Sequence, residues 1–119
     1  MNTDQERLLL IHAYGDENSE ALSTALRVAR NSTERLGPHV AIQIVVQGPA
    51  VKLLTAGTIY EDDLATVKNH PAIRILACEN SMASAAVERG QLLPAIGTVP
   101  SAVAHLTERQ WDGAAYVRF

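Results

Sequence analysis

The chain has 119 residues, and its ten Lys and Arg against thirteen Asp and Glu give a net charge of -3 at pH 7. This length fits one domain over residues 1–119, and the acidic balance disfavours binding to duplex nucleic acid. Aromatic residues make up 4% of the chain, which is too few for a surface that stacks single-stranded bases. No apolar run approaches the roughly 20 residues needed to cross a bilayer, so we expect a soluble, cytoplasmic protein.

The first half of the chain alternates between strand-like and helix-like patterns. Short continuous apolar runs are typical of buried strands, whereas apolar residues three and four positions apart are typical of helices. These patterns predict a strand over Leu8–Ile11, a helix from Ser19 to about Leu36, a strand over Val40–Val46 and a short helix through Val51–Leu54. Asn18 or Ser19 can cap the first of these helices, and Gly37 and Pro38 end it.

The second half continues the same alternation. We expect a helix from Glu61 to about Asn69, a strand over Ile73–Ala77, a helix over Ser81–Arg89 closed by Gly90, a short extended piece at Thr98–Val99, a helix capped by Ser101 that runs to about Trp111, and a last strand over Ala114–Phe119. Strands that alternate with helices at this spacing predict a parallel or mostly parallel sheet with helices on both faces.

Polar residues follow the first three predicted strands directly. In an open parallel sheet, ligands bind beyond the carboxyl ends of the strands, where such residues meet. The segments concerned are His12–Asp16, Gln47–Pro49 and Cys78–Ser81. From these segments we take the candidate ligand-binding residues, which are His12, Tyr14, Gln47, Gly48, Asn80 and Ser81.

Cys78 is the single cysteine of the chain and the strongest nucleophile at this edge. It precedes a predicted helix, whose backbone N–H groups would stabilise a thiolate, whereas a carboxylate at Glu79 would oppose it. A cysteine at the end of a buried strand is equally compatible with a packing role. His12 can orient a ligand or act as a base toward Cys78, or it can be a hydrogen-bonded core residue.

The sequence contains none of the common cofactor motifs. One cysteine and four histidines without metal-ligand spacing predict no metal site. The segment that begins at Gly48 lacks the spacing of a phosphate-binding loop, and no glycine pattern of a dinucleotide-binding site is present. We therefore expect no cofactor.

Several segments resemble a known family in their order and spacing. They are Gln47–Leu54, Ala77–Met82, Leu92–Ile96, Val99–Leu106 and Gly113–Arg118. Together they resemble the DsrE/DsrF-like family of small sulfur-relay proteins, in its single-domain, stand-alone branch, from about Leu8 to Arg118. The resemblance implies a three-layer α/β/α sandwich with a five-stranded, mostly parallel sheet. It also implies a homo-oligomer, commonly a trimer or a hexamer.

The resemblance further implies a function. In sulfur-relay members, a cysteine at the end of a central strand takes up sulfur as a persulfide and passes it to a partner protein. That role falls on Cys78, and it would make the chain a sulfurtransferase component with separate donor and acceptor proteins. Two alternatives remain open at this stage. One is a non-catalytic, oligomeric module that binds a small ligand beside a structural Cys78, and the other is a scaffold that uses Trp111 and Ala114–Phe119 as contact surface.

Overall fold

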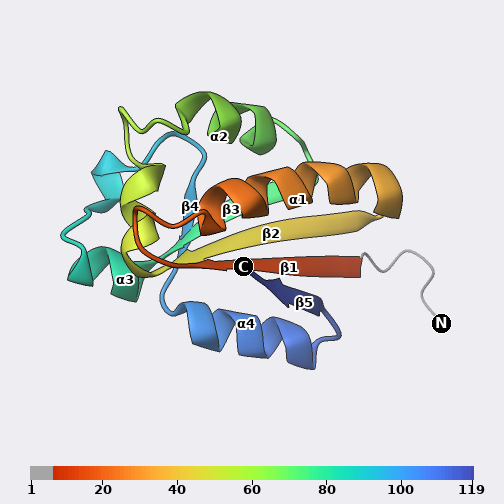
Figure 1. Ribbon diagram of the computed structural model, residues 1–119. Helices are drawn as coiled ribbons and strands as arrows, with labels where there is room; N and C mark the ends of the chain where they lie inside the picture. The colour runs from red at the N-terminus through yellow and green to blue at the C-terminus, as the bar shows by residue number, and fades with distance from the viewer. Residues whose placement is uncertain (1–6) are drawn as a thin grey trace.

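The computed structural model describes residues 7–119, which form a central sheet with helices on both faces (Figure 1). The elements along the chain are β1 (Arg7–Tyr14), α1 (Ala21–Leu36), β2 (Val40–Gln47), the 3-10 helix η1 (Gly48–Leu54), α2 (Glu61–Lys68), β3 (Ile73–Cys78), α3 (Glu79–Ser84), the 3-10 helix η2 (Arg89–Gln91), β4 (Gly97–Val99), α4 (Ala102–Trp111) and β5 (Ala115–Arg118). The five strands lie in the order β4-β3-β2-β1-β5, and every neighbouring pair is parallel. The expected α/β/α sandwich is therefore confirmed. No helix in this part of the chain is long and apolar enough to cross a membrane.

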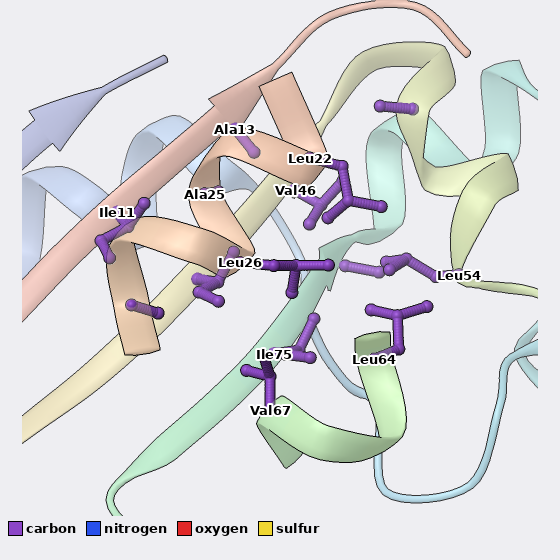
Figure 2. Close-up of a cluster of buried hydrophobic side chains, with 14 of the residues drawn as sticks. Ile11, Ala13, Leu22, Ala25, Leu26, Val46, Leu54, Leu64, Val67 and Ile75 are labelled. Carbon is purple, nitrogen blue, oxygen red and sulfur yellow. The ribbon is translucent and has the colours of Figure 1, made fainter. Parts of the chain in front are cut away.

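One face of the sheet carries most of the core. Alternate residues of the three central strands point toward α1, α2 and η1, and Figure 2 shows these side chains meeting Leu26 of α1 and Leu64 of α2. Leu26 is 1% exposed and Leu64 is completely buried. The buried side chains of this cluster are all apolar, so the face is held together by the hydrophobic effect and close packing. We call it the α1 face.

The opposite face, which we call the α4 face, is covered by α4 (Figure 1). Its smaller apolar cluster includes Leu10, Val45 and Leu76 from the strands and Leu106 from α4. Along β2, the residues that share this face with Val45 are the polar Gln43 and Gln47, because every second residue of a strand lies on the same face. Cys78 belongs to this cluster, so the sheet directs the thiol toward α4 and away from the larger core.

Three local predictions differ from the structure. The first strand continues to Tyr14, because His12 and Tyr14 stay in register with β2 where a turn was expected. The first helix begins after Glu20 and has no side-chain cap, since Ser19 donates its hydroxyl to the carbonyl of Asp16. The predicted helix over Ser81–Arg89 is wrong at both ends, because α3 begins at Glu79 and stops at Ser84, before the left-handed backbone of Ala86.

Candidate functional site

A pocket of about 440 Å³ lies at the carboxyl ends of β1, β2 and β3. Its wall is made by the ends of these strands, the start of η1, the short helix α3 and the first residues of α4. The lining residues are Tyr14, Gln47, Gly48, Pro49, Lys52, Cys78, Asn80, Ser81, Ser84, Ala85, Ser101, Ala102 and Val103. This is the edge at which a parallel sheet is expected to bind a ligand.

The sulfur of Cys78 lies in the wall of this pocket although the residue as a whole is 2% exposed. Burial is the largest single influence on the thiol and raises its pKa. Hydrogen bonds from the Ser81 hydroxyl and from the backbone N–H groups of Ser81, Ala102 and Asn80 together outweigh burial, so that the pKa of Cys78 is lowered. The Ala102 nitrogen lies 3.4 Å from Sγ. The site therefore stabilises a thiolate through donors that carry no charge.

Ser81 is held so that its hydroxyl donates to the sulfur. The backbone N–H of Gly48 donates to Oγ of Ser81 over 2.8 Å, which occupies a lone pair of the oxygen and leaves its proton for Cys78. The resulting chain runs from the β2–η1 junction through α3 to the thiol. The backbone at the end of β2 thus positions the hydroxyl that donates to Cys78 at the end of β3.

Gly48 could not be replaced without disturbing this junction. Its φ is +81°, and a Cβ atom at this position would lie 2.8 Å from the carbonyl oxygen of Gly15. That carbonyl accepts the N–H of Ala50 over 2.9 Å, so it is held in place by η1. Glycine is therefore required both by the backbone conformation and by the close approach of the β1–α1 loop.

The carboxylate of Glu79 is engaged away from the thiol. Arg89 donates to Oε2 of Glu79, and the hydroxyl of Thr98 donates to the same oxygen over 2.6 Å. Glu79 does not contribute to the pKa shift of Cys78. The negative charge next to the cysteine in the sequence is therefore paired with Arg89 of η2 and hydrogen-bonded to Thr98 of β4.

His12 lies behind the pocket wall. Its Nε2 is 2.7 Å from Oε1 of Gln47, and its Nδ1 is 2.7 Å from the hydroxyl of Tyr116 on β5. Burial lowers the pKa of His12, the bond to Gln47 raises it, and the charge of Arg118 lowers it, with burial the largest influence and a lowered pKa as the result. The ring is therefore neutral near pH 7 and has no free nitrogen for Cys78.

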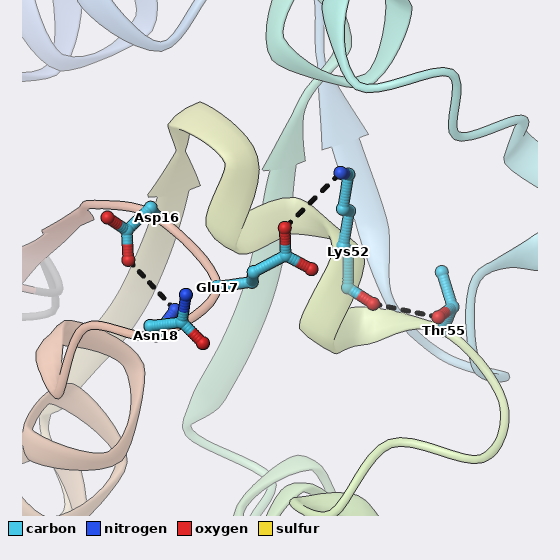
Figure 3. Close-up of polar contacts among 5 residues, drawn as sticks. All are labelled: Asp16, Glu17, Asn18, Lys52 and Thr55. Atoms are coloured by element: carbon cyan, nitrogen blue, oxygen red, sulfur yellow. Dashed lines mark hydrogen bonds and ion pairs between the residues drawn. The ribbon is translucent and has the colours of Figure 1, made fainter.

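The mouth of the pocket carries the charged groups of the site. Lys52 lines the pocket and donates to the carboxylate of Glu17 over 3.3 Å, as Figure 3 shows. Arg118 lies over the ring of Tyr14, 5.3 Å from its centroid. Asp16, in the same loop as Glu17, turns back and accepts the N–H of Asn18 over 2.8 Å (Figure 3). Lys52 thus brings a charge to the pocket lining that Glu17 partly neutralises, while Arg118 reaches the pocket only through its contact with Tyr14.

Most residues singled out from the sequence lie together at this pocket. Tyr14, Gln47, Gly48, Cys78, Asn80 and Ser81 line it, whereas His12 stands one residue behind, in contact with Gln47. Sequence reasoning missed the wall formed by Ser101–Val103 and the contribution of Lys52. The wall at Ser101–Val103 could have been predicted, because these residues follow β4 just as the other lining segments follow their strands. A short helix was predicted around Lys52, but the face that this helix turns toward the pocket depends on tertiary packing.

Nothing in this part of the chain resembles a metal centre. Within residues 7–119, no group of three or more His, Cys, Asp or Glu side chains could hold a metal ion. The chemistry that the site offers is therefore that of a thiolate in a pocket lined by hydrogen-bond donors. The fold and the site define a class of small parallel α/β proteins with a cysteine at the carboxyl edge of the sheet.

Comparison with known proteins identifies the family. The family model described as DsrE/DsrF-like matches residues 7–119, and the chain belongs to this family. Among solved structures, the chain is similar to a protein of unknown function, MTH1491 from Methanobacterium thermoautotrophicum, with 26% identity and a TM-score of 0.85 over 96% of this chain and 100% of that one. No curated protein matches the chain.

Two further structures share the fold at lower identity. The ychN protein from E. coli has 16% identity and a TM-score of 0.77 over 97% of this chain and 100% of its own. A conserved protein of unknown function, BT1422 from Bacteroides thetaiotaomicron, has 21% identity and a TM-score of 0.73 over 94% of each chain. These likenesses confirm the fold class.

Proposed function

We propose that the protein is a sulfur carrier that holds sulfur as a persulfide on Cys78 and hands it to a partner protein. The observation that carries the proposal is the position of Cys78 in the wall of the pocket, where the backbone N–H of Ala102 donates to its sulfur over 3.4 Å. A thiolate is the nucleophile that sulfur transfer requires, and hydrogen bonding to Cys78 lowers the pKa of its thiol, which favours that form. Membership of the DsrE/DsrF-like family supports the same reading.

The reaction balances without an external oxidant. The thiolate of Cys78 attacks the outer sulfur of a donor persulfide, the S–S bond of the donor breaks, and the donor leaves as a thiolate. Cys78 then carries the additional sulfur. In the second step an acceptor thiolate attacks that outer sulfur, and the bonding electron pair returns to Sγ of Cys78, where the N–H of Ala102 stabilises the thiolate.

The absence of a second cysteine suits a carrier. With one cysteine in the chain, no intramolecular disulfide can discharge the persulfide. The sulfur can therefore leave only to an external thiol. The low exposure of Cys78 limits that exchange to molecules that reach it through the pocket.

The test is sulfur loading followed by intact-mass measurement. The protein is incubated with glutathione persulfide, and we expect one added sulfur atom on the wild type and none on Cys78→Ser. Far-UV circular dichroism of Cys78→Ser checks that the fold is retained. Loading of Cys78→Ser to the wild-type level, or no loading of the wild type by any persulfide donor, would refute the proposal.

A second candidate function is binding of a small ligand by a non-catalytic module. The observation that favours it is the burial of Cys78, which is also typical of an inert packing cysteine. The pH dependence of alkylation of the native protein separates the two candidates. A thiol that reacts with a pKa below the free value of about 8.5 supports the carrier, and one that reacts only after denaturation supports the binding module.

We also propose that the protein forms a homo-oligomer, a trimer or a hexamer. The support is the exposure of large apolar side chains on α4, where Val103 and Trp111 are exposed. Trp111 is 80% exposed, which is unusual for the largest side chain of the chain. Light scattering at several concentrations gives the molar mass, and a monomer at every concentration would refute the proposal.

A further inference from the structure

A chain of three polar side chains connects the edge strand β5 to the wall of the pocket. Tyr116 of β5 contacts His12 of β1, and His12 contacts Gln47 of β2, each over 2.7 Å. His12 is 7% exposed, so water has little access to replace either contact. Of the three side chains, that of Gln47 lines the pocket.

The direction of both hydrogen bonds follows from the chemistry of the groups. The amide oxygen of Gln47 has no proton and can only accept, so Nε2 of His12 must donate to it. In a neutral imidazole the other nitrogen accepts, so the hydroxyl of Tyr116 donates to Nδ1. The charge state agrees, because burial keeps the pKa of His12 below its ordinary value. A phenol donates more readily than it accepts, so Tyr116 favours the same tautomer of His12 as Gln47 does, with the proton on Nε2.

With its proton on Nε2, His12 in turn favours one orientation of the Gln47 amide. Its oxygen is held toward His12, and its NH2 group, with two protons, is left for the pocket. Val46 is paired with Ala77, so the next position along the two strands sets Gln47 beside Cys78 on the α4 face. The amide does not contribute to the pKa shift of Cys78, so it is free to bind an atom beyond Sγ.

We propose that Tyr116 and His12 are positioning residues, which hold the Gln47 amide as a hydrogen-bond donor to the outer sulfur of a Cys78 persulfide; this inference rests on the proposed function. The outer sulfur of a persulfide anion carries the negative charge and accepts hydrogen bonds. A donor at that atom withdraws charge and so reduces its repulsion of an incoming acceptor thiolate. An amide turned the other way would present its oxygen to the same sulfur and would repel it.

The first test compares sulfur transfer by loaded wild type and loaded Tyr116→Phe to a thiol acceptor such as glutathione. Tyr116→Phe removes one oxygen, and with it one of the two contacts that keep the proton of His12 on Nε2. We expect the transfer rate to fall roughly threefold to tenfold, which is the effect of about one hydrogen bond. The alkylation pKa of the unloaded Cys78 thiol should stay unchanged, because the donors on Sγ are untouched. Tyr60→Phe, on the α1 face, is the matched control.

The second test uses two glutamines of the same strand. Gln43 accepts from Nε2 of His105 over 2.7 Å, as Gln47 accepts from His12, but Gln43 lies outside the pocket lining. Gln47→Leu should slow transfer as much as Tyr116→Phe does, and Gln43→Leu should leave the rate unchanged. The double variant Tyr116→Phe/Gln47→Leu should be no slower than Gln47→Leu, because both substitutions remove the same interaction.

A readout that does not depend on sulfur distinguishes failure of this inference from failure of the proposed function. Nitrogen NMR of the imidazole should show the proton of His12 on Nε2 in the wild type and a mixture of tautomers in Tyr116→Phe. A mixture in the wild type overturns the inference whether or not a persulfide forms. If a persulfide forms but its transfer is unaffected by Tyr116→Phe and Gln47→Leu, the inference fails and the carrier function stands. The inference would also be overturned if the alkylation pKa of Cys78 changed in Tyr116→Phe by enough to account for the slower transfer.

Discussion

The two faces of the sheet differ in what their buried positions contain. The cluster on the α1 face is apolar throughout, whereas the α4 face buries His12 and Cys78 among fewer apolar side chains. Both faces are built from the same strands, and strand alternation alone separates them. The difference teaches that the α1 face supplies most of the stability, while the thinner α4 face can accommodate the polar groups of the site.

The largest effect should come from emptying the α1 face. Leu26→Ala removes a side chain that is 1% exposed at the centre of the larger cluster (Figure 2). We expect the free energy of unfolding to fall by about 2–5 kcal/mol, measured by urea denaturation. The pKa of Cys78 should be unchanged in the folded variant. A loss of stability below about 1 kcal/mol would contradict the assignment of the core to this face.

The equivalent substitution beneath α4 should lower the free energy of unfolding by less, and it should also change the reactivity of Cys78. Leu106 packs in the same cluster as Cys78 and Ala102, so Leu106→Ala loosens the helix that donates to the sulfur. We expect a loss of about 2 kcal/mol in urea denaturation and faster alkylation of Cys78 at neutral pH. Unchanged alkylation would mean that α4 does not control access to the thiol.

Ser81→Ala tests the hydrogen bonding of the thiol directly. The variant loses the hydroxyl that donates to Cys78 and leaves the N–H of Gly48 without its partner. We expect the pKa of Cys78 to rise, because a hydrogen bond that lowers it is lost. The pH dependence of alkylation measures this, with Ser84→Ala of the same helix as the control. Equal pKa values in the two variants would rule out the role of the Ser81 hydroxyl.

The buried His12 and the half-buried His105 should make stability depend on pH. Burial is the main cause that lowers the pKa of both His12 and His105 from the ordinary value of 6.5. The unfolded chain therefore takes up protons more readily, so stability is fully present above pH 6.5 and declines as the pH falls below it. Urea denaturation at pH 7.5 and pH 5.5 measures the decline, which His105→Gln should reduce. A flat profile would place both rings in contact with water.

The smallest effect should come from the rim. Glu17 and Lys52 form an ion pair of 3.3 Å whose side chains are 48% and 42% exposed (Figure 3). Glu17→Gln should change the free energy of unfolding by less than about 1 kcal/mol, since water screens such pairs. Urea denaturation in low and high salt checks this. A larger loss would mean that the rim, and not the two faces alone, holds the fold together.

The strands and the location of the site could be predicted because they depend on local patterns. Apolar runs predicted β2 and β3, and the rule for strand ends placed Gln47 and Cys78 at one edge. The early end predicted for β1 is instructive. His12 is a polar residue, which favours a turn over a buried strand. It can lie within β1 because Gln47 and Tyr116, which are distant in the sequence, supply its hydrogen-bond partners.

The remaining features depend on contacts between distant residues. The pairing of β5 with β1 brings Tyr116 to His12, and no local pattern specifies that order of strands. The end of α3 was missed for a similar reason. Ala85 and Ala86 favour a helix, but the N–H of Val87 bonds back to the carbonyl of Met82 and the chain turns away. Tertiary contacts here override the intrinsic preference of alanine.

The pairing of β5 with β1 also has a consequence for folding kinetics. The bond between His12 and Tyr116 joins residues 104 positions apart, so forming it closes a loop of nearly the whole chain. Contacts of such long range form late, because the entropy of closing the loop is lost before the contact can repay it. We therefore expect β5 to be the last strand to dock and the first to exchange its amide protons. The tautomer of His12 would then be set in the final step of folding.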